Sequence, residues 1–296
     1  MIKPFVEMVA DNYGQQFSVD RVCYESRTDY QHLLIFQNSD FGRVLILDGI
    51  VQCTERDEFI YHEMLAHVPI FAHGQAKNVL IIGGGDGGTL REVLRHRQAA
   101  QVTLVEIDGQ LLDICREQLP NHHQGAFEDP RTRILIQDGI RFVKETSEKF
   151  EVIISDATDP VGPGKALFTA DFYAGCRRCL APGGVLVTQN GVAFFQLDEV
   201  TGTARSLSGL FEDWGFYTAA VPTYVGGIMA FGWASDDPSL RQTSLQTLKT
   251  RYKTAEIATR YYTPEIHQAS FVLPQYVQDA INAVYFTDFQ EPKEWN

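Results

Sequence analysis

The sequence predicts an α/β protein in which a doubly wound, largely parallel sheet follows a small antiparallel β domain. From about Lys77 onward, short apolar runs alternate with amphipathic stretches, which is the pattern of strands connected by helices. The first of these runs leads directly into the glycine-rich segment Gly83–Gly88, as in sheets that bind nucleotides at one edge. Before residue 60, alternating runs are separated by turn residues, which is typical of antiparallel hairpins.

Each element is located by its hydrophobic pattern and its turn signals. In the first part, strands are expected at Gln31–Phe36 and Arg43–Leu47. In the second part, the expected strands are Asn78–Ile82, Val102–Ile107, Arg133–Gln137, Val152–Ser155 and Val185–Gln189. Helices are expected at Thr89–Arg97, Gln110–Gln118, Thr169–Leu180 and Pro274–Val284. The last part of the sheet is predicted to be an antiparallel pair, Phe216–Pro222 and Gly227–Ser235.

These elements divide the chain into three predicted parts. Residues 1–60 form a β-hairpin domain, residues 61–285 a Rossmann-like catalytic domain, and residues 286–296 a loose polar tail. A chain of 296 residues is long enough for one large domain and a smaller module.

The composition argues against several classes of protein. The formal net charge is -13, so the surface repels phosphate backbones and nucleic acid is not expected as a partner. No uncharged apolar run approaches the ~18 residues that span a bilayer, and the N-terminus lacks the apolar core of a signal peptide. The five scattered cysteines favour reduced thiols and a cytoplasmic location.

The glycine-rich segment and two acids after it predict a nucleoside site. Glycine lets the backbone approach a ligand closely, and the segment stands between the first strand and the first helix of the sheet. Glu106 ends the second strand, where an acid accepts hydrogen bonds from ribose hydroxyls. Asp138, followed by Gly139, ends the third strand and can accept from an adenine amino group. A structural turn with a surface acid is the alternative interpretation.

Asp86, within the glycine-rich segment, indicates which nucleoside is bound. A pyrophosphate would stand beside this carboxylate, and two anions about 4 Å apart repel by about 4 kcal/mol at an effective dielectric near 20. A nucleoside without phosphates, of the S-adenosyl type, therefore fits better. Asp86 would also oppose the carboxylate of S-adenosylmethionine and attract the ammonium of its decarboxylated form. This favours the decarboxylated donor over a methyltransferase substrate.

Two further carboxylates, Asp156 and Asp159, follow the fourth strand at the same edge of the sheet. A primary amine with a pKa near 10.4 has roughly one molecule in 10³ unprotonated at neutral pH, so an enzyme that uses it must bind the cation and remove a proton. One carboxylate can take the proton while the other fixes the orientation. The alternative is that both acids only cap turns.

Several segments resemble the spermidine synthase family, and its bacterial branch is nearest. They are Leu47–Glu58, Ile60–Met64, Gly83–Gly88, Asp156–Pro163 and Pro222–Tyr224, within a resemblance that runs from about residue 15 to residue 284. The resemblance implies transfer of an aminopropyl group from decarboxylated S-adenosylmethionine to a diamine, usually putrescine, giving spermidine and 5'-methylthioadenosine. It also implies a homodimer, no metal and no cofactor besides the donor, and a flexible Asp-Pro-x-Gly-Pro lid over the site.

The same resemblance assigns roles to individual residues. Asp156 is the general base, Asp159 helps to hold the diamine, and Tyr61 and Tyr224 line the reacting amine. Asp86 binds the ammonium of the donor. The remaining donor-site positions are Gln31, Gln52, His62, Glu106, Asp138, Gly139 and Pro163. His62 stands where animal members carry glutamine, so donor binding is expected to be kept while the acceptor pocket can differ.

Two other functions stay open at this point: an S-adenosylmethionine methyltransferase of the same fold, and a silent polyamine-binding protein. The acceptor is also open among putrescine, cadaverine, agmatine and spermidine. Cys176 and Cys179 lack the second ligand pair of a zinc site and are expected to pack in a helix. His122 and His123 are expected in a solvated loop.

Overall fold

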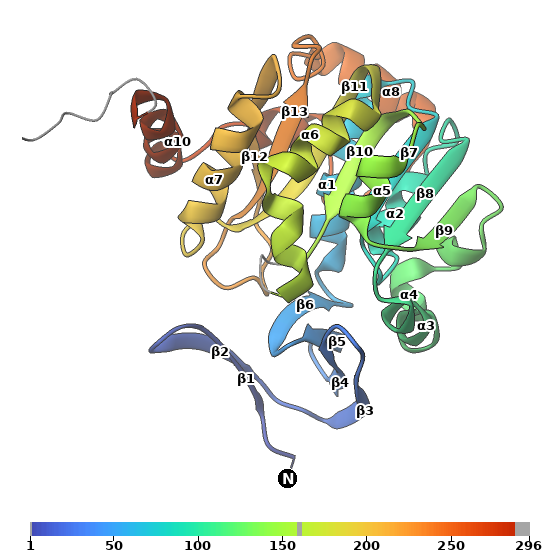
Figure 1. Cartoon of the computed structure of the whole chain (residues 1–296). Helices are drawn as coiled ribbons and strands as arrows, with labels where there is room; N and C mark the ends of the chain where they lie inside the picture. Colours follow the sequence, from blue (N-terminus) through green and yellow to red (C-terminus); the bar gives the residue numbers. More distant parts are fainter. Residues whose placement is uncertain (1, 159–161, 288–296) are drawn as a thin grey trace, which may run out of the picture.

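A seven-stranded mixed sheet forms the centre of the computed structural model, which describes residues 2–158 and 162–287 (Figure 1). Its strands are β7 (Asn78–Gly83), β8 (Gln101–Glu106), β9 (Thr132–Ile136), β10 (Phe150–Asp156), β11 (Leu180–Val192), β12 (Asp213–Ala219) and β13 (Met229–Ser235). They lie in the order β12-β13-β11-β10-β7-β8-β9. Strands β7 to β11 are parallel, while β13 is antiparallel to both β11 and β12. The predicted doubly wound sheet with a terminal antiparallel pair is confirmed.

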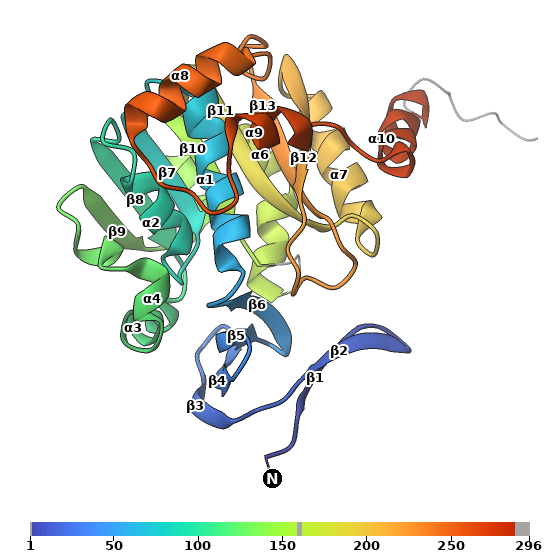
Figure 2. The same ribbon diagram turned by 180° about the vertical axis from the view of Figure 1, so that it is seen from behind.

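Helices cover both faces of this sheet because successive strand residues point to opposite sides. On β7, Ile81 faces the core shared with α1 (Glu58–His73), α2 (Gly88–Leu94) and α8 (Leu245–Ala255). Its neighbour Leu80 faces the core shared with α5 (Gly139–Glu145), α6 (Ala170–Cys179) and α7 (Leu197–Ser208). Figure 2 shows α1, α8 and α9 (Pro264–Ser270) together on the first face, and α10 (Gln275–Thr287) lies beside α7.

Two smaller antiparallel sheets precede the large sheet. One is the hairpin of β1 (Phe5–Ala10) and β2 (Tyr13–Phe17), and the other contains β3 (Arg21–Arg27), β4 (His32–Asn38), β5 (Gly42–Leu47) and β6 (Ile50–Thr54). Leu33 and Leu45 of the second sheet share a buried cluster with Leu111 and Cys115 of α3 (Gly109–Gln118). This packing holds the N-terminal sheet below the carboxyl ends of the parallel strands (Figure 1). The division of the chain at residue 60 stays a prediction.

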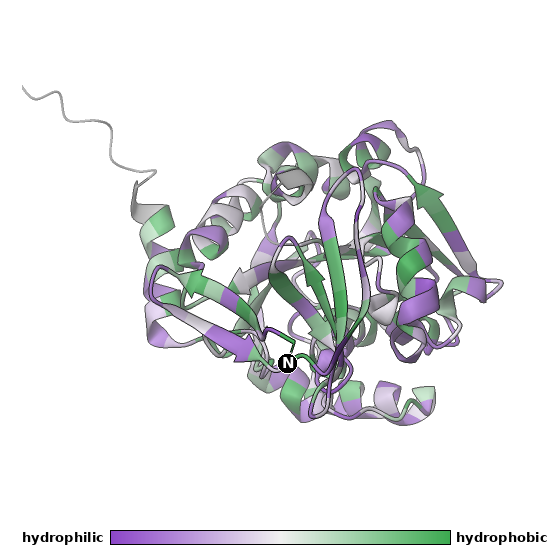
Figure 3. Cartoon of the chain, turned by 90° about the horizontal axis from the view of Figure 1, so that it is seen from below, coloured by the Kyte–Doolittle hydropathy of each residue, from purple (hydrophilic) through white to green (hydrophobic). Residues whose placement is uncertain are grey.

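Hydropathy follows the same layers. Figure 3 shows green, hydrophobic strands in the middle of the molecule and purple, hydrophilic residues on the outer turns. Within the described residues, no helix combines the length and apolar character needed to cross a membrane.

Helix α1 is absent from the sequence-based expectation, which ended the β-rich part near residue 60 and resumed at Lys77. The helix is buried on nearly every side, so polar and apolar residues are mixed around it instead of forming one apolar stripe. Pro69 within it also weakens the helical pattern. Helices of this kind are poorly marked by periodicity alone.

The prediction that His122 and His123 lie in a solvated loop is wrong. Both belong to the short helix α4 (Pro120–His123), and both side chains are buried. The carbonyl oxygen of His122 accepts a hydrogen bond from Arg91 of α2, and α4 packs against α2. The short helices η1 (Ala126–Glu128) and η2 (Gly162–Phe168) complete the described elements.

We expect Gly139→Ala to destabilise the protein, because the added Cβ would lie 2.5 Å from Cγ2 of Ile82, which is buried under α5. Such overpacking costs about 1–3 kcal/mol. Gly202→Ala, inside α7, meets open space and is expected to stabilise by about 0.4–1 kcal/mol. Urea unfolding of the two variants measures both effects. Equal unfolding midpoints for Gly139→Ala and the wild type would contradict the close contact.

Candidate active site

A cavity of about 580 Å³ opens where the strand order reverses between β7 and β10, between the carboxyl edge of the large sheet and the N-terminal sheet. Ligands of doubly wound folds bind at such reversal points. The cavity is lined by ten of the twelve predicted site residues: Gln31, Gln52, Tyr61, His62, Asp86, Glu106, Asp138, Gly139, Asp156 and Tyr224. Asp159 lies outside the described residues, as does the side chain of Pro163.

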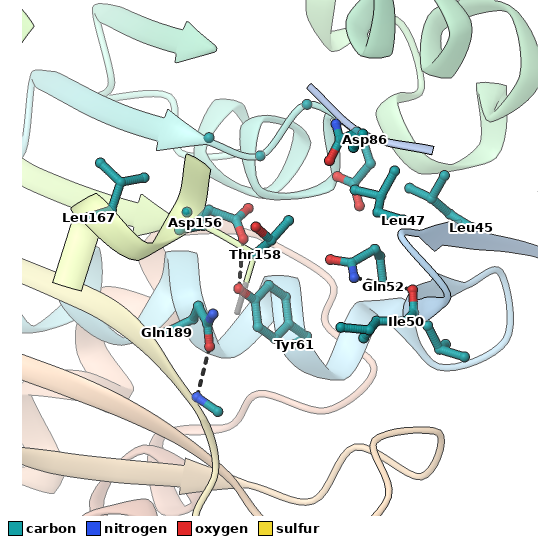
Figure 4. Close-up of a pocket in the computed structure, with 18 of the residues that line it drawn as sticks. Leu45, Leu47, Ile50, Gln52, Tyr61, Asp86, Asp156, Thr158, Leu167 and Gln189 are labelled. Atoms are coloured by element: carbon teal, nitrogen blue, oxygen red, sulfur yellow. Dashed lines mark hydrogen bonds between the residues drawn. The ribbon is translucent and has the colours of Figure 1, made fainter. Parts of the chain in front are cut away.

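Asp156 ends β10 and has a partner for each carboxylate oxygen. The hydroxyl of Tyr61 donates to Oδ1 at 2.6 Å (Figure 4), and the hydroxyl of Thr89 donates to Oδ2 at 2.7 Å. Burial raises the pKa of Asp156, the charge of His62 lowers it, and the charge of Asp86 raises it again, with a net shift upward. A carboxylate with a raised pKa is a stronger proton acceptor than one in water.

Asp86 follows the glycines of the β7–α2 loop and lies to one side of the Tyr61–Asp156 pair in Figure 4. The backbone N–H of Gly88 donates to its Oδ1 at 2.8 Å, and Nε2 of His62 lies 3.4 Å from its Oδ2. Burial alone would raise the pKa of Asp86, but the charge of His62 and its hydrogen bond outweigh burial and lower it. Asp86 is therefore an ionised carboxylate inside the cavity.

The loop can approach Asp156 because it consists of glycines. Gly84 has a φ of +70°, and a Cβ on it would lie 2.8 Å from Oδ2 of Asp156. A side chain at this position would both strain the backbone and displace the carboxylate.

Two further acids line the cavity near the ends of the neighbouring strands β8 and β9. Glu106 ends β8 and accepts a hydrogen bond from the backbone N–H of Asp108 at 2.9 Å. Burial raises the pKa of Glu106 to about 7 despite that hydrogen bond. Gln31 donates to Asp108 at 3.0 Å, which fixes its side chain at the mouth of the same cavity. Asp138 caps α5 by accepting from the N–H of Ile140 at 2.8 Å.

Tyr224 contacts both walls of the cavity. Its hydroxyl donates to the carbonyl oxygen of Gln52 at 2.5 Å, and its ring packs edge-on against Tyr61 with 5.9 Å between centroids. The pKa of Tyr224 and that of Tyr61 are raised by burial, so both hydroxyls keep their protons. The two tyrosines thus act as uncharged donors and form an aromatic wall beside Asp156.

Several lining residues were not predicted from the sequence. Glu7 of β1 is buried, and its carboxylate accepts from the N–H of Val51 at 3.0 Å and from Gln15 at 2.5 Å. Gln15 also donates to the carbonyl oxygen of Thr223 at 2.7 Å, which ties the hairpin to the segment before Tyr224. A single acid in a short strand carries no sequence signal, because its burial depends on how the hairpin folds back.

Behind the cavity lies a buried ion-pair cluster that starts at His62. Its Nδ1 is 2.5 Å from Glu58, whose carboxylate also accepts from Arg91 at 2.8 and 3.1 Å. Arg91 donates in turn to Glu92 at 2.8 Å. Burial disfavours the charge on His62, but Asp86 and Glu58 together raise its pKa to about 10.

Comparison with known proteins places this architecture in a family. Residues 58–244 match the family model described as the spermine/spermidine synthase domain, and residues 5–55 match the spermidine synthase tetramerisation domain. Polyamine aminopropyltransferase 1 of Pseudomonas aeruginosa is 58% identical over 94% of this chain and 97% of its own length. The polyamine aminopropyltransferase of a Klebsiella pneumoniae strain is 57% identical with the same coverage. The crystal structure of spermidine synthase from Thermotoga maritima has a TM-score of 0.89 at 37% identity and covers 95% of each chain.

These likenesses span almost the whole chain, and with the fold and cavity they define it as a Rossmann-like transferase. The chain belongs to the spermine/spermidine synthase family and is an aminopropyl-transferring enzyme. The resemblance to the bacterial branch is confirmed. The roles of the individual site residues stay predictions.

We expect Arg91→Met to destabilise the protein by about 3–5 kcal/mol, because it removes the guanidinium that pairs with two buried carboxylates at once, those of Glu58 and Glu92. Arg97→Met is the control, since the Arg97 side chain is 81% exposed and, among residues 2–158 and 162–287, pairs with Glu256 alone, so its loss is expected to cost at most about 1 kcal/mol. Chemical denaturation measures both variants. Similar losses in the two would show that the buried cluster does not need Arg91.

Proposed function

We propose that this enzyme transfers the aminopropyl group of decarboxylated S-adenosylmethionine to putrescine, giving spermidine and 5'-methylthioadenosine. The observation that carries the proposal is that an ionised carboxylate, Asp86, and a carboxylate of raised pKa, Asp156, line one cavity. The ionised Asp86 suits a cation that must stay charged, and Asp156, with its raised pKa, suits an amine that must lose a proton. A spermidine synthase of the same fold (TM-score 0.90, 37% identity) has been solved with the transition state analogue AdoDATO, which supports a site of this kind here.

In the proposed complex, the donor lies along the carboxyl edge of the sheet. Glu106 accepts from the ribose hydroxyls, and Asp138 with Gly139 meets the adenine, because Glu106 ends β8 while Asp138 and Gly139 begin α5 just after the neighbouring strand β9. Asp86 binds the ammonium of the aminopropyl group. No metal and no further cofactor is needed in the proposal, since the sulfonium charge already activates the donor.

The proposed reaction is one in-line displacement. Asp156 removes a proton from the reacting ammonium of the diamine, and the nitrogen lone pair then attacks the propyl carbon next to sulfur. The new C–N bond forms as the C–S bond breaks, and sulfur keeps the electron pair of that bond, so 5'-methylthioadenosine leaves as a neutral thioether. Tyr61 and Thr89 hold both oxygens of Asp156, which fixes the direction in which it accepts the proton.

The far end of the diamine requires a second negative site, because its other amine stays protonated. Glu7 offers a buried carboxylate in the same cavity. A short path of contacts connects it to the reacting end, from Gln15 and Thr223 to Tyr224, Tyr61 and Asp156. We propose that Glu7 receives this distal ammonium and that a compact diamine is therefore preferred over one with a bulkier or polar end, such as agmatine.

We also propose a homo-oligomer. The family model over residues 5–55 is described as a tetramerisation domain, so a tetramer competes with the expected dimer. Val6, Met8 and Tyr13 on the hairpin are half-exposed apolar side chains, which supports an interface on this element.

The test is a turnover assay that follows 5'-methylthioadenosine release with decarboxylated S-adenosylmethionine and putrescine, cadaverine, agmatine or spermidine. We expect putrescine to have the highest kcat/KM. Release with another amine as the best substrate would keep the transferase and correct the acceptor. Release of S-adenosylhomocysteine from S-adenosylmethionine in a parallel assay would indicate a methyltransferase, and folded protein that binds polyamines without turnover would indicate a silent binder.

Asp156→Asn is expected to lower kcat by about 10²–10⁴-fold, because the amide cannot accept the proton. The affinity for 5'-methylthioadenosine, measured by calorimetry, is expected to change little, since Asp156 contacts the amine and not the nucleoside in the proposed complex. Asp171→Asn, an exposed acid in the first turn of α6, serves as the control and is expected to keep full activity. Full activity of Asp156→Asn would exclude it as the base.

A further inference from the structure

The imidazole of His62 lies between two carboxylates in a site closed to water. Its Nδ1 is 2.5 Å from Oε2 of Glu58, its Nε2 is 3.4 Å from Oδ2 of Asp86, and the residue is 2% exposed. A neutral imidazole carries one N–H, so its other nitrogen would direct a lone pair at a carboxylate. Both nitrogens can face carboxylates favourably only when both carry protons. The geometry therefore requires an imidazolium at position 62.

Glu58 is held in the orientation that this arrangement needs. It stands four residues before His62 on α1, so the two side chains share one face of the helix. The guanidinium of Arg91 donates to both oxygens of Glu58, at 3.1 and 2.8 Å, and Arg91 is itself paired with Glu92. Such a two-pronged contact fixes the carboxylate plane. Glu58 itself does not line the cavity that holds Asp86, so it acts on that cavity through His62.

We propose that Glu58 is a positioning residue for the transfer reaction: it keeps His62 doubly protonated and oriented, and thereby sets the net charge that Asp86 presents to the ammonium of the donor. The proposal rests on the proposed function, in which Asp86 binds that ammonium. An unopposed carboxylate in a buried site would hold a cation strongly. The aminopropyl ammonium must leave with the product, so it must not be bound too tightly. The positive charge of His62 beside Asp86 lowers the affinity of Asp86 for this ammonium, and the reduction is the same at every pH at which His62 stays charged.

The charged and titratable groups around His62 come from every element that packs against it. They are Glu58 and Tyr61 on α1, Cys53 on β6, Asp86 on the β7–α2 loop, Arg91 on α2, His122 on α4 and Asp156 on β10. Only Glu58 and Asp86 among them form an ion pair with its ring in the described part of the chain. His122 is buried and its pKa is lowered by burial, so it adds no positive charge at neutral pH. Loss of Glu58 therefore removes one of the two charges that keep His62 protonated.

The test compares Glu58→Gln with the wild type by calorimetric binding of decarboxylated S-adenosylmethionine and of 5'-methylthioadenosine, which lacks the ammonium, from about pH 6.5 to about pH 9. Glu106, whose pKa is about 7, also titrates in this range, so each variant is compared with the wild type at the same pH. In Glu58→Gln the glutamine still donates to Nδ1, but His62 loses its proton within this range. Relative to the wild type, the ratio of the two affinities is then expected to rise about tenfold in favour of the donor as pH rises, since one repelling charge is lost.

Two control variants separate positioning from a merely structural role. His62→Gln and Glu58→Gln/His62→Gln carry no titratable ring at position 62, so the difference between their ratio and the wild-type ratio is expected to stay constant with pH. Glu63→Gln removes another buried acid of α1, whose carboxylate accepts from backbone N–H groups of residues 260–262 and forms no ion pair with the His62 ring in the described residues, so its ratio is expected to match the wild type. A structural defect would weaken both ligands alike and leave the ratio of Glu58→Gln parallel to that of the wild type at every pH, which would overturn the proposal.

A spectroscopic readout on the wild-type protein keeps the inference testable if Glu58→Gln does not fold. The ¹⁵N chemical shifts of the His62 ring are expected to show two protonated nitrogens at about pH 8. A neutral tautomer at that pH would overturn the proposal whatever the enzyme turns over. Failure of the diamine assay, by contrast, would overturn the proposed function and leave the protonation state of His62 as measured.

Discussion

The structure depends on holding two carboxylates, Asp86 and Asp156, inside one cavity away from bulk water. Two such charges repel each other and each loses hydration, so neither is tolerated without specific partners. Asp156 is held by two hydroxyls, whereas Asp86 is held by a backbone N–H and an imidazolium. The different partners move the pKa values of two chemically identical groups in opposite directions, and in the proposed function this separation lets one carboxylate bind a cation while the other takes a proton.

The compensation extends well behind the cavity. His62 pairs with Glu58, Glu58 pairs with Arg91, and Arg91 pairs with Glu92. Positive and negative charges therefore alternate along a row that ends at Arg95, whose side chain is one-third exposed. Helix α1, which packs on one face of the sheet against β10 and β11 and is buried on nearly every side, supplies Glu58, Tyr61 and His62 within two turns. Removal of an inner member takes away one of the counter-charges of each of its neighbours in the row.

The second wall of the cavity comes from the N-terminal sheets, and it is fixed by both apolar and polar contacts. Leucines of β4 and β5 pack on α3, and Asp108, the N-cap of α3, accepts hydrogen bonds from Thr28 and Gln31. The hairpin adds Glu7 to the same cavity. The small domain thus completes a site whose other half lies on the large sheet.

The sequence by itself determined the alternation of strands and helices and the position of the glycine-rich turn, because both depend on local periodicity and turn residues. It also placed Glu106 and Asp156 at one edge of the sheet, because neighbouring parallel strands all end at the same edge. It also contained the segments that identify the family. It did not reveal α1, whose burial on nearly every side removes the amphipathic pattern, nor the burial of His122 and His123.

Only the tertiary structure decided that Glu58 and Arg91 support His62, and that Glu7 reaches the cavity. Those contacts join residues from separate elements, and their energies depend on distance and dehydration, which no local pattern records.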